Sequence, residues 1–161
     1  MSYAYIQDKE SAAPGIWRRY SGRWAWPTVL LGALVLSGWV AIWICVAQGW
    51  LALWVGALIQ TGWAYLAFTP LHEATHGNIG GRGQMGFWDQ ALGWPSAFLL
   101  LSPFPAFRQI HLRHHAQTNR PGLDPDLWVA ADRPLGVLLR CLSILPFYYV
   151  YFLTRLGLES P

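Results

Sequence analysis

Charged residues are scarce in this chain and unevenly placed. Only 12% of its 161 residues are Asp, Glu, Lys or Arg, and none of these occurs from Trp24 to Leu71. A soluble domain carries about 25% charged residues, so this composition argues against a large water-soluble core. The hydrophobic share of 54% and the 11 tryptophans instead indicate a membrane protein with one domain.

Other absences narrow the functional classes. The two cysteines, Cys45 and Cys141, form no C-x-x-C pair, so we expect reduced, structural thiols. The sequence "GRGQMG" fits G-x-G-x-x-G but follows an apolar helix and not a strand, which argues against dinucleotide binding. The net charge of +3 comes mainly from arginines, which we expect at anionic headgroups and not on nucleic acid. The polar N-terminus does not resemble a cleaved signal peptide.

The uncharged stretch predicts a transmembrane helical hairpin. It is too long for one span of about 20 residues, and Gln48-Gly49 interrupts it near the middle. We therefore expect helices over 26–47 and 50–70. Arginines precede the first helix and the connecting turn is uncharged, so the positive-inside bias places the N-terminus and the end of the second helix in the cytosol.

Downstream segments are too short or too interrupted to be clear spans. Residues 91–101 contain Pro95 and predict a re-entrant or interfacial helix. Ser102-Pro103 resembles a helix start, and we expect that helix to run to about Asn119. Residues 134–158 are apolar but carry internal Arg and Pro, so they either begin a third span or lie in the interface.

The expected organisation is all-α, with an integral membrane hairpin and cytosolic or interfacial helices in a single domain over 1–161. Its parts are a cytosolic segment 1–23, the hairpin 24–71, a region 72–133 with the histidines and the interfacial helix, and an apolar C-terminal helix 134–161.

All five histidines fall into two clusters. His72 and His76 are four residues apart, and His111, His114 and His115 have the spacing i, i+3, i+4. On a helix both spacings bring the imidazoles to one face. Five histidines clustered in so apolar a chain predict a metal site.

The two clusters have local signs of helical placement. Gly77-Asn78 predicts the end of the helix that carries His72 and His76. A catalytic zinc needs three protein ligands and a structural zinc needs four, so five histidines favour a two-metal site. Imidazole binds iron, zinc, copper and nickel alike, so the type of ligand does not identify the metal.

The two clusters resemble a known family. "HEATHG" at the end of a hairpin, followed by "FPAFRQIHLRHHAQTNRPGLDPD", is similar to the first and second histidine boxes of the membrane fatty acid desaturase and hydroxylase superfamily. The resemblance covers roughly residues 24 to 140. The end of the second motif, with Asp124-Pro125-Asp126, looks most like the branch that contains carotenoid ring hydroxylases.

The resemblance implies a chemistry and a set of site residues. It implies two irons, O2 as co-substrate, a lipid substrate and an electron donor of the ferredoxin or cytochrome b5 type. The fatty acyl chain is the first expected substrate and the carotenoid ring the second. The implied metal ligands are His72, His76, His111, His114 and His115. Glu73, Asp124 and Asp126 are expected as partners of these histidines or as substitute ligands.

One departure from the family pattern affects activity. The family carries a third box, His-x-x-His-His, near its C-terminus, whereas this sequence has no histidine after His115. We therefore expect an N-terminal part of a longer catalytic unit, which does not turn over by itself.

Two rival functions use the same residues. His72-Glu73-Ala74-Thr75-His76 also fits H-E-x-x-H, in which Glu73 is the general base of a membrane zinc protease. That scheme leaves His111, His114 and His115 without a role. A non-catalytic membrane metal-binding protein is the third possibility.

Overall fold

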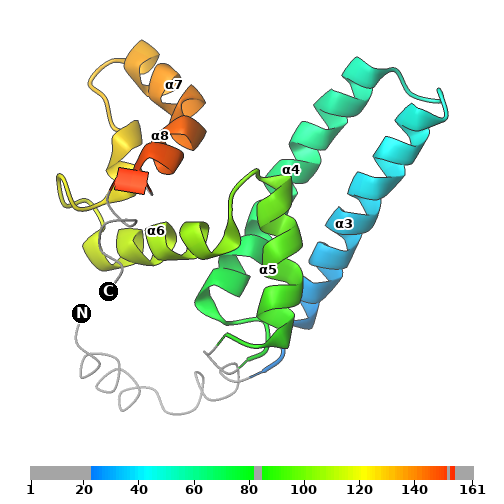
Figure 1. The fold of residues 1–161 in the computed structure, drawn as a ribbon, viewed down its shortest axis with the longest axis horizontal. Helices are drawn as coiled ribbons and strands as arrows, with labels where there is room; N and C mark the ends of the chain where they lie inside the picture. Colours follow the sequence, from blue (N-terminus) through cyan, green and yellow to red (C-terminus); the bar gives the residue numbers. More distant parts are fainter. Residues whose placement is uncertain (1–22, 82–84, 152, 155–161) are drawn as a thin grey trace. The chain divides into compact units, whose positions relative to one another are not determined.

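Helices are the regular elements of the residues that the structure describes. This computed structural model describes residues 23–81, 85–151 and 153–154, and Figure 1 shows them as helices joined by turns. The expected all-α class is confirmed. The expected cytosolic segment 1–23 lies outside the described residues except for Arg23, as does the middle of "GRGQMG".

The chain forms two compact units, Met1–Phe104 and Pro105–Pro161. The described residues of the first unit form α3 (Trp26–Ala47), α4 (Leu53–His76) and α5 (Phe87–Leu99). The helix α6 (Phe104–Gln117) begins at the junction, and the second unit continues with the 3-10 helix η1 (Pro125–Val129), α7 (Pro134–Leu142) and α8 (Ile144–Tyr151).

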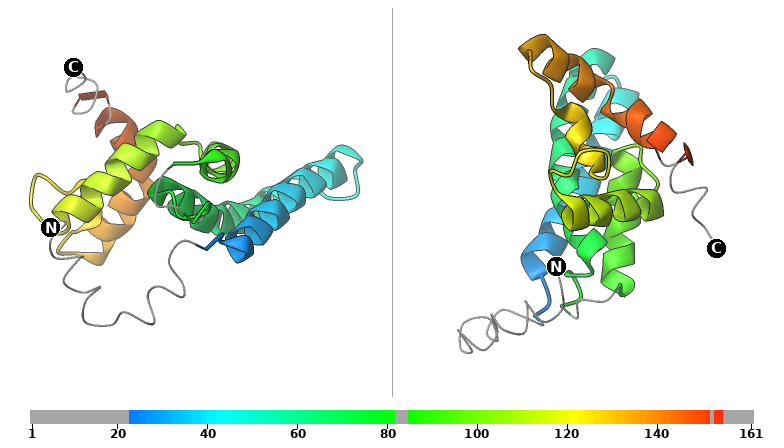
Figure 2. Two further views of the ribbon diagram at one scale, coloured as in Figure 1. Left: turned by 90° about the horizontal axis from the view of Figure 1, so that it is seen from below. Right: turned by 90° about the vertical axis from the view of Figure 1, so that its left-hand side faces the viewer.

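The expected hairpin is present as two adjacent helices, α3 and α4, which Figure 2 shows running side by side. Pro27 lies in the first turn of α3, where its missing N–H costs no hydrogen bond. Gly49 has a φ of 75° in the turn between the helices, a left-handed conformation that favours glycine. The chain therefore reverses where Gln48-Gly49 predicts it.

α3 has the length and composition of a membrane span. The core helix of a soluble protein would be mostly buried, whereas α3 exposes large apolar side chains such as Trp26, Leu30 and Trp43. Among the described residues α3 is the one candidate span. The expected second span, 50–70, is helical within α4 but does not meet the same criterion, because α4 is less apolar.

Small residues let the helices of the first unit approach closely. Val35, Ala67 and Leu99 form a buried cluster from α3, α4 and α5. A Cβ on Gly93 of α5 would lie 2.4 Å from Cζ of Phe104, whose side chain is buried. The close packing of Phe104 on Gly93 thus depends on the absence of a side chain at that position.

Gly93→Ala is expected to destabilise the first unit by about 1–3 kcal/mol, because the added methyl group overpacks the contact with Phe104. Gly62 in α4 is the matched control, since a Cβ there meets nothing within 4 Å. Gly62→Ala should be neutral or stabilising by up to about 1 kcal/mol, because alanine favours a helix. Thermal unfolding in detergent micelles measures both changes. Equal stability of the two variants would contradict the packing.

The C-terminal part of the described chain is a pair of short helices. α7 has 9 residues and α8 has 8, and Ser143 separates them. Neither is long enough to cross a membrane, which takes about 20 residues. The described residues of the segment 134–161, expected as an apolar helix, are helical in two parts, α7 and α8, with Ser143 between them.

Candidate metal centre

The first pair of histidines lies in the last two turns of α4. The ring centroids of His72 and His76 are 4.8 Å apart, so the spacing of four does bring them to one face. The helix ends at Gly77, with a φ of 70°, where the expected stop lies. The carbonyl end of a helix carries partial negative charge, which favours a cation near these rings.

Glu73 is hydrogen-bonded within its own box. His72 Nδ1 lies 3.1 Å from Glu73 Oε1, and Asn78 Nδ2 donates to Glu73 Oε2 over 3.2 Å. A carboxylate only accepts hydrogen bonds, so His72 Nδ1 carries the proton and Nε2 is the unprotonated nitrogen. Glu73 thus fixes the tautomer that a metal ligand requires.

A buried carboxylate holds the turn that follows the first box. Asp89 of α5 is fully buried and accepts hydrogen bonds from the backbone N–H of Ile79 and of Gly86, each over 2.9 Å. The carbonyl of Ile79 accepts a bond from the Ala25 N–H over 3.0 Å. These bonds tie the turn after His76 to the starts of α3 and α5.

The second pair of histidines lies one turn apart on α6. His111 and His115 have ring centroids 4.6 Å apart, and their Nε2 atoms lie 3.0 Å from each other. At that distance one Nε2 donates its proton to the lone pair of the other, so both nitrogens face the same space between the rings. A cation that binds both nitrogens can replace that proton.

His114 belongs to the same box but faces a different partner. Its Nδ1 lies 2.8 Å from Asp124 Oδ1 and 3.3 Å from Asp126 Oδ2. Both carboxylates only accept, so Nδ1 donates and Nε2 keeps its lone pair. Each box therefore contains one histidine whose Nδ1 is held by a carboxylate.

Asp124 is held in turn by the backbone around it. Its Oδ2 accepts from the Asn119 N–H over 2.7 Å, and its Oδ1 accepts from the Asp126 N–H over 2.9 Å. Burial raises the pKa of the Asp124 carboxyl, but the hydrogen bonds from His114 and from these two N–H groups outweigh it and leave the pKa below its usual value. Asp124 is thus ionised at neutral pH and able to hold the His114 proton.

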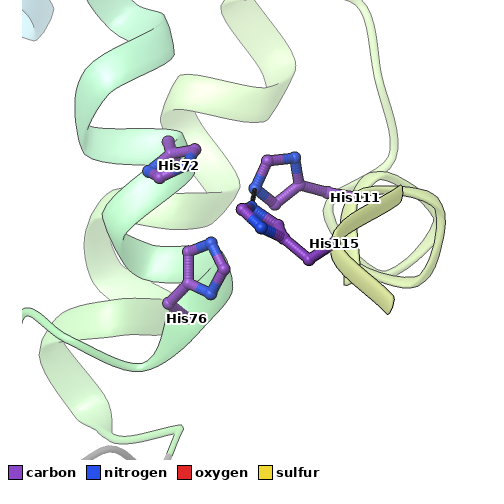
Figure 3. Close-up of side chains that lie close together, drawn as sticks. All are labelled: His72, His76, His111 and His115. Carbon is purple, nitrogen blue, oxygen red and sulfur yellow. Dashed lines mark hydrogen bonds between the residues drawn. The ribbon is translucent and has the colours of Figure 1, made fainter. Parts of the chain in front are cut away.

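Four of the five histidines form a group suited to a metal ion. His72, His76, His111 and His115 each offer one ligand atom, and these four atoms lie within 4.8 Å of one another (Figure 3). Imidazole nitrogens bind such metals at about 2.0–2.1 Å, so ligands on opposite sides of one ion lie about 4 Å apart. The observed spread of up to 4.8 Å is slightly wider than this. The donor set fits a borderline-soft metal such as iron or zinc.

The sequence predicted the histidines but missed several of their partners. The spacing of the boxes led to all five histidines and to Glu73, Asp124 and Asp126 as neighbours. No motif marks Asn78, which donates to Glu73, or Asp89, which holds the turn after His76, so neither contact was identified from the sequence. The hydroxyl of Thr118 donates to the backbone carbonyl of His114 over 2.8 Å and so does not contact its ring through this bond.

Comparison with known proteins agrees with the two boxes. Residues 48–160 match the model of a family described as fatty acid desaturase. The match begins later than the residue 24 expected from the sequence and extends beyond residue 140. It therefore includes both histidine boxes and leaves all of α3 outside. No curated protein and no solved structure matches the chain.

Proposed function

The chain belongs to the fatty acid desaturase family, and from this premise we propose that it supplies the histidine centre of a di-iron enzyme that oxidises a membrane lipid with O2. Members of the family are membrane-associated di-iron oxidoreductases. The fatty acyl chain is the proposed substrate, with the carotenoid ring as the second candidate. The electron donor is proposed to be of the ferredoxin or cytochrome b5 type.

The observation that carries this proposal is the group of four imidazoles from two helices. An imidazole centre offers neutral ligands, which leave a divalent iron electrophilic. His114 is proposed as a fifth ligand through Nε2, because Asp124 holds its Nδ1 proton. Glu73, Asp124 and Asp126 are proposed to orient histidines and not to bind the metal.

The residues of the chain have separate tasks in this scheme. The bound irons would supply the activation of O2 that breaks an unactivated C–H bond. The histidines would hold the ions, and Glu73 and Asp124 keep the proton on Nδ1 of His72 and His114. The exposed apolar surface of α3 is proposed to lie in lipid, with the histidine boxes on the cytosolic side, which would keep the site beside an acyl substrate.

Metal analysis tests the function. The chain, purified in detergent and loaded anaerobically with Fe(II), is expected to hold about two irons per chain, with Mössbauer parameters of nitrogen ligation. The loaded chain by itself is expected to form no oxidised lipid after addition of O2, a lipid and a reduced electron carrier, as measured by mass spectrometry, because its sequence has no histidine after His115. Binding of one zinc that iron does not displace, together with peptide cleavage, would contradict the proposal.

Glu73→Gln separates the oxygenase from the membrane zinc protease. The amide oxygen of glutamine still accepts the His72 Nδ1 proton, so metal affinity should fall less than about tenfold, whereas Glu73→Ala should lower it about 10–100-fold. In the protease the same Glu73→Gln change removes the general base and abolishes cleavage without loss of metal. The measurement is a Co(II) titration of each variant beside an assay for peptide cleavage.

Both oxygens of Glu73 already accept hydrogen bonds, from His72 and from Asn78. A general base instead needs an oxygen directed at a metal-bound water. This geometry favours the orienting role over the protease.

A further inference from the structure

We propose that Tyr148 of α8 is a positioning residue for the second histidine box, acting through Asp126 on His114. The proposal rests on the proposed function only in treating His114 as a metal ligand. No motif assigns Tyr148 a role, and the sequence places it in an apolar segment with the character of a membrane helix.

The contacts form a continuous chain within the second unit. The hydroxyl of Tyr148 donates to Asp126 Oδ1. The other oxygen of Asp126, Oδ2, lies 3.3 Å from His114 Nδ1, which also contacts Asp124 Oδ1 over 2.8 Å. The proton on His114 Nδ1 is thus shared between the carboxylates of Asp124 and Asp126. Tyr148 restrains Asp126, which the backbone holds less firmly than Asp124.

Asp124 and Asp126 differ in how they are anchored. Asp124 accepts two backbone N–H bonds and its side chain is 2% exposed, whereas the side chain of Asp126 is 35% exposed. A half-exposed carboxylate samples several rotamers unless another group restrains it. The hydrogen bond from the Tyr148 hydroxyl supplies this restraint for Asp126.

Tyr148 is held firmly enough for this task. Its ring lies 5.8 Å from that of Phe147, and Phe147 stacks on Trp128 of η1 at 4.4 Å with an interplanar angle of 7°. Burial, and after it the Asp126 carboxylate, raise the pKa of the Tyr148 phenol. The hydroxyl therefore keeps its proton at any physiological pH and always acts as a donor to Asp126.

The consequence is that α8 belongs to the metal centre. The stacking of α8 on η1 positions the Tyr148 side chain, and the Tyr148 hydroxyl restrains the Asp126 carboxylate. Asp126 in turn helps to orient the His114 ring and thereby its Nε2. An orienting partner of a metal-bound histidine typically contributes 10–100-fold to metal affinity. A residue one contact further away should lie at about the lower end of that range.

The experiment is a double-mutant cycle on the full chain in detergent micelles, with Co(II) as the probe. Tyr148→Phe is expected to raise the Kd for Co(II) about tenfold and to change the visible absorption of the bound ion. Asp126→Asn is expected to weaken binding at least as much. The double variant should bind no more weakly than Asp126→Asn alone, because Tyr148 acts through Asp126.

Tyr65→Phe is the matched control, since it removes a hydroxyl from a side chain that is 81% exposed. Its Kd should equal that of the unchanged chain. An unchanged Kd in Tyr148→Phe, or losses that add up in the double variant, would overturn the role of Tyr148. Failure of the unchanged chain to bind Co(II) or Fe(II) would instead overturn the proposed function.

A second readout needs no metal. In ¹⁵N-histidine NMR spectra of the metal-free chain, Tyr148→Phe and Asp126→Asn should each shift the Nδ1–H signal of His114. The Nδ1–H signal of His72, which faces Glu73, should stay in place and serves as the internal reference. A His114 signal that does not move in either variant would refute the connection even if one variant bound metal poorly through misfolding.

Discussion

Replacing His111 and His115 together by alanine is expected to abolish metal binding. The two Nε2 atoms lie 3.0 Å apart and make up half of the four-histidine group. Loss of direct ligands should exceed the 10–100-fold effect of losing an orienting partner, so affinity should fall by more than about 100-fold. Inductively coupled plasma analysis of iron per chain and a Co(II) titration measure the loss.

Gln117→Ala is the control for this change. Gln117 ends the same helix, and its side chain accepts a hydrogen bond from Arg120 over 3.1 Å. Its variant should retain full metal content. If the double histidine variant still bound iron with the affinity of the unchanged chain, the assignment of the second box would be wrong. Circular dichroism shows whether α6 remains helical, as alanine should favour.

Replacing Asp89 by alanine is expected to lower the stability of the first unit by about 2–4 kcal/mol. The change leaves the buried Ile79 N–H without an acceptor, at a cost of about 1–3 kcal/mol. It also removes the side-chain bond at the start of α5, which is worth about 1 kcal/mol. Against a total stability of about 5–15 kcal/mol for a typical domain, this is a large share. Thermal unfolding in micelles measures it.

The same change should weaken metal binding through the first box. Ile79 lies in the turn that follows His76, and Asp89 holds that turn against α5. Asp132→Ala removes the same charge from an exposed position and should leave both stability and metal content unchanged. An Asp89→Ala variant as stable as Asp132→Ala would show that the turn does not depend on this carboxylate.

The helices around the histidines were predictable from the sequence because local signals determine them. Gly77 ends α4, and Gly49 reverses the chain, since both adopt positive φ. His72 and His76 face the same side because the helical period places them there. The spacing of the histidines and the positions of these glycines were therefore enough to predict where both boxes lie along the helices.

The side-chain contacts that support the two boxes could not be predicted from the sequence in the same way. Asp89 reaches Ile79 across the turn, and Tyr148 reaches Asp126 from another helix. Both contacts depend on how helices pack, and no spacing rule encodes that. The apolar character of the segment around Tyr148 likewise predicted a third span or an interfacial position and no contact with Asp126.

The pairing of carboxylates with histidines has a consequence for charge balance. Two divalent ions bound by neutral imidazoles would bring four positive charges to the edge of a low-dielectric region, where uncompensated charge is costly. Glu73, Asp124 and Asp126 each contact a histidine of the boxes. These three carboxylates can offset three of the four charges from behind the imidazole rings, so the net charge of the centre falls. The ions meanwhile keep neutral ligands, which donate less electron density to them than bound carboxylates would.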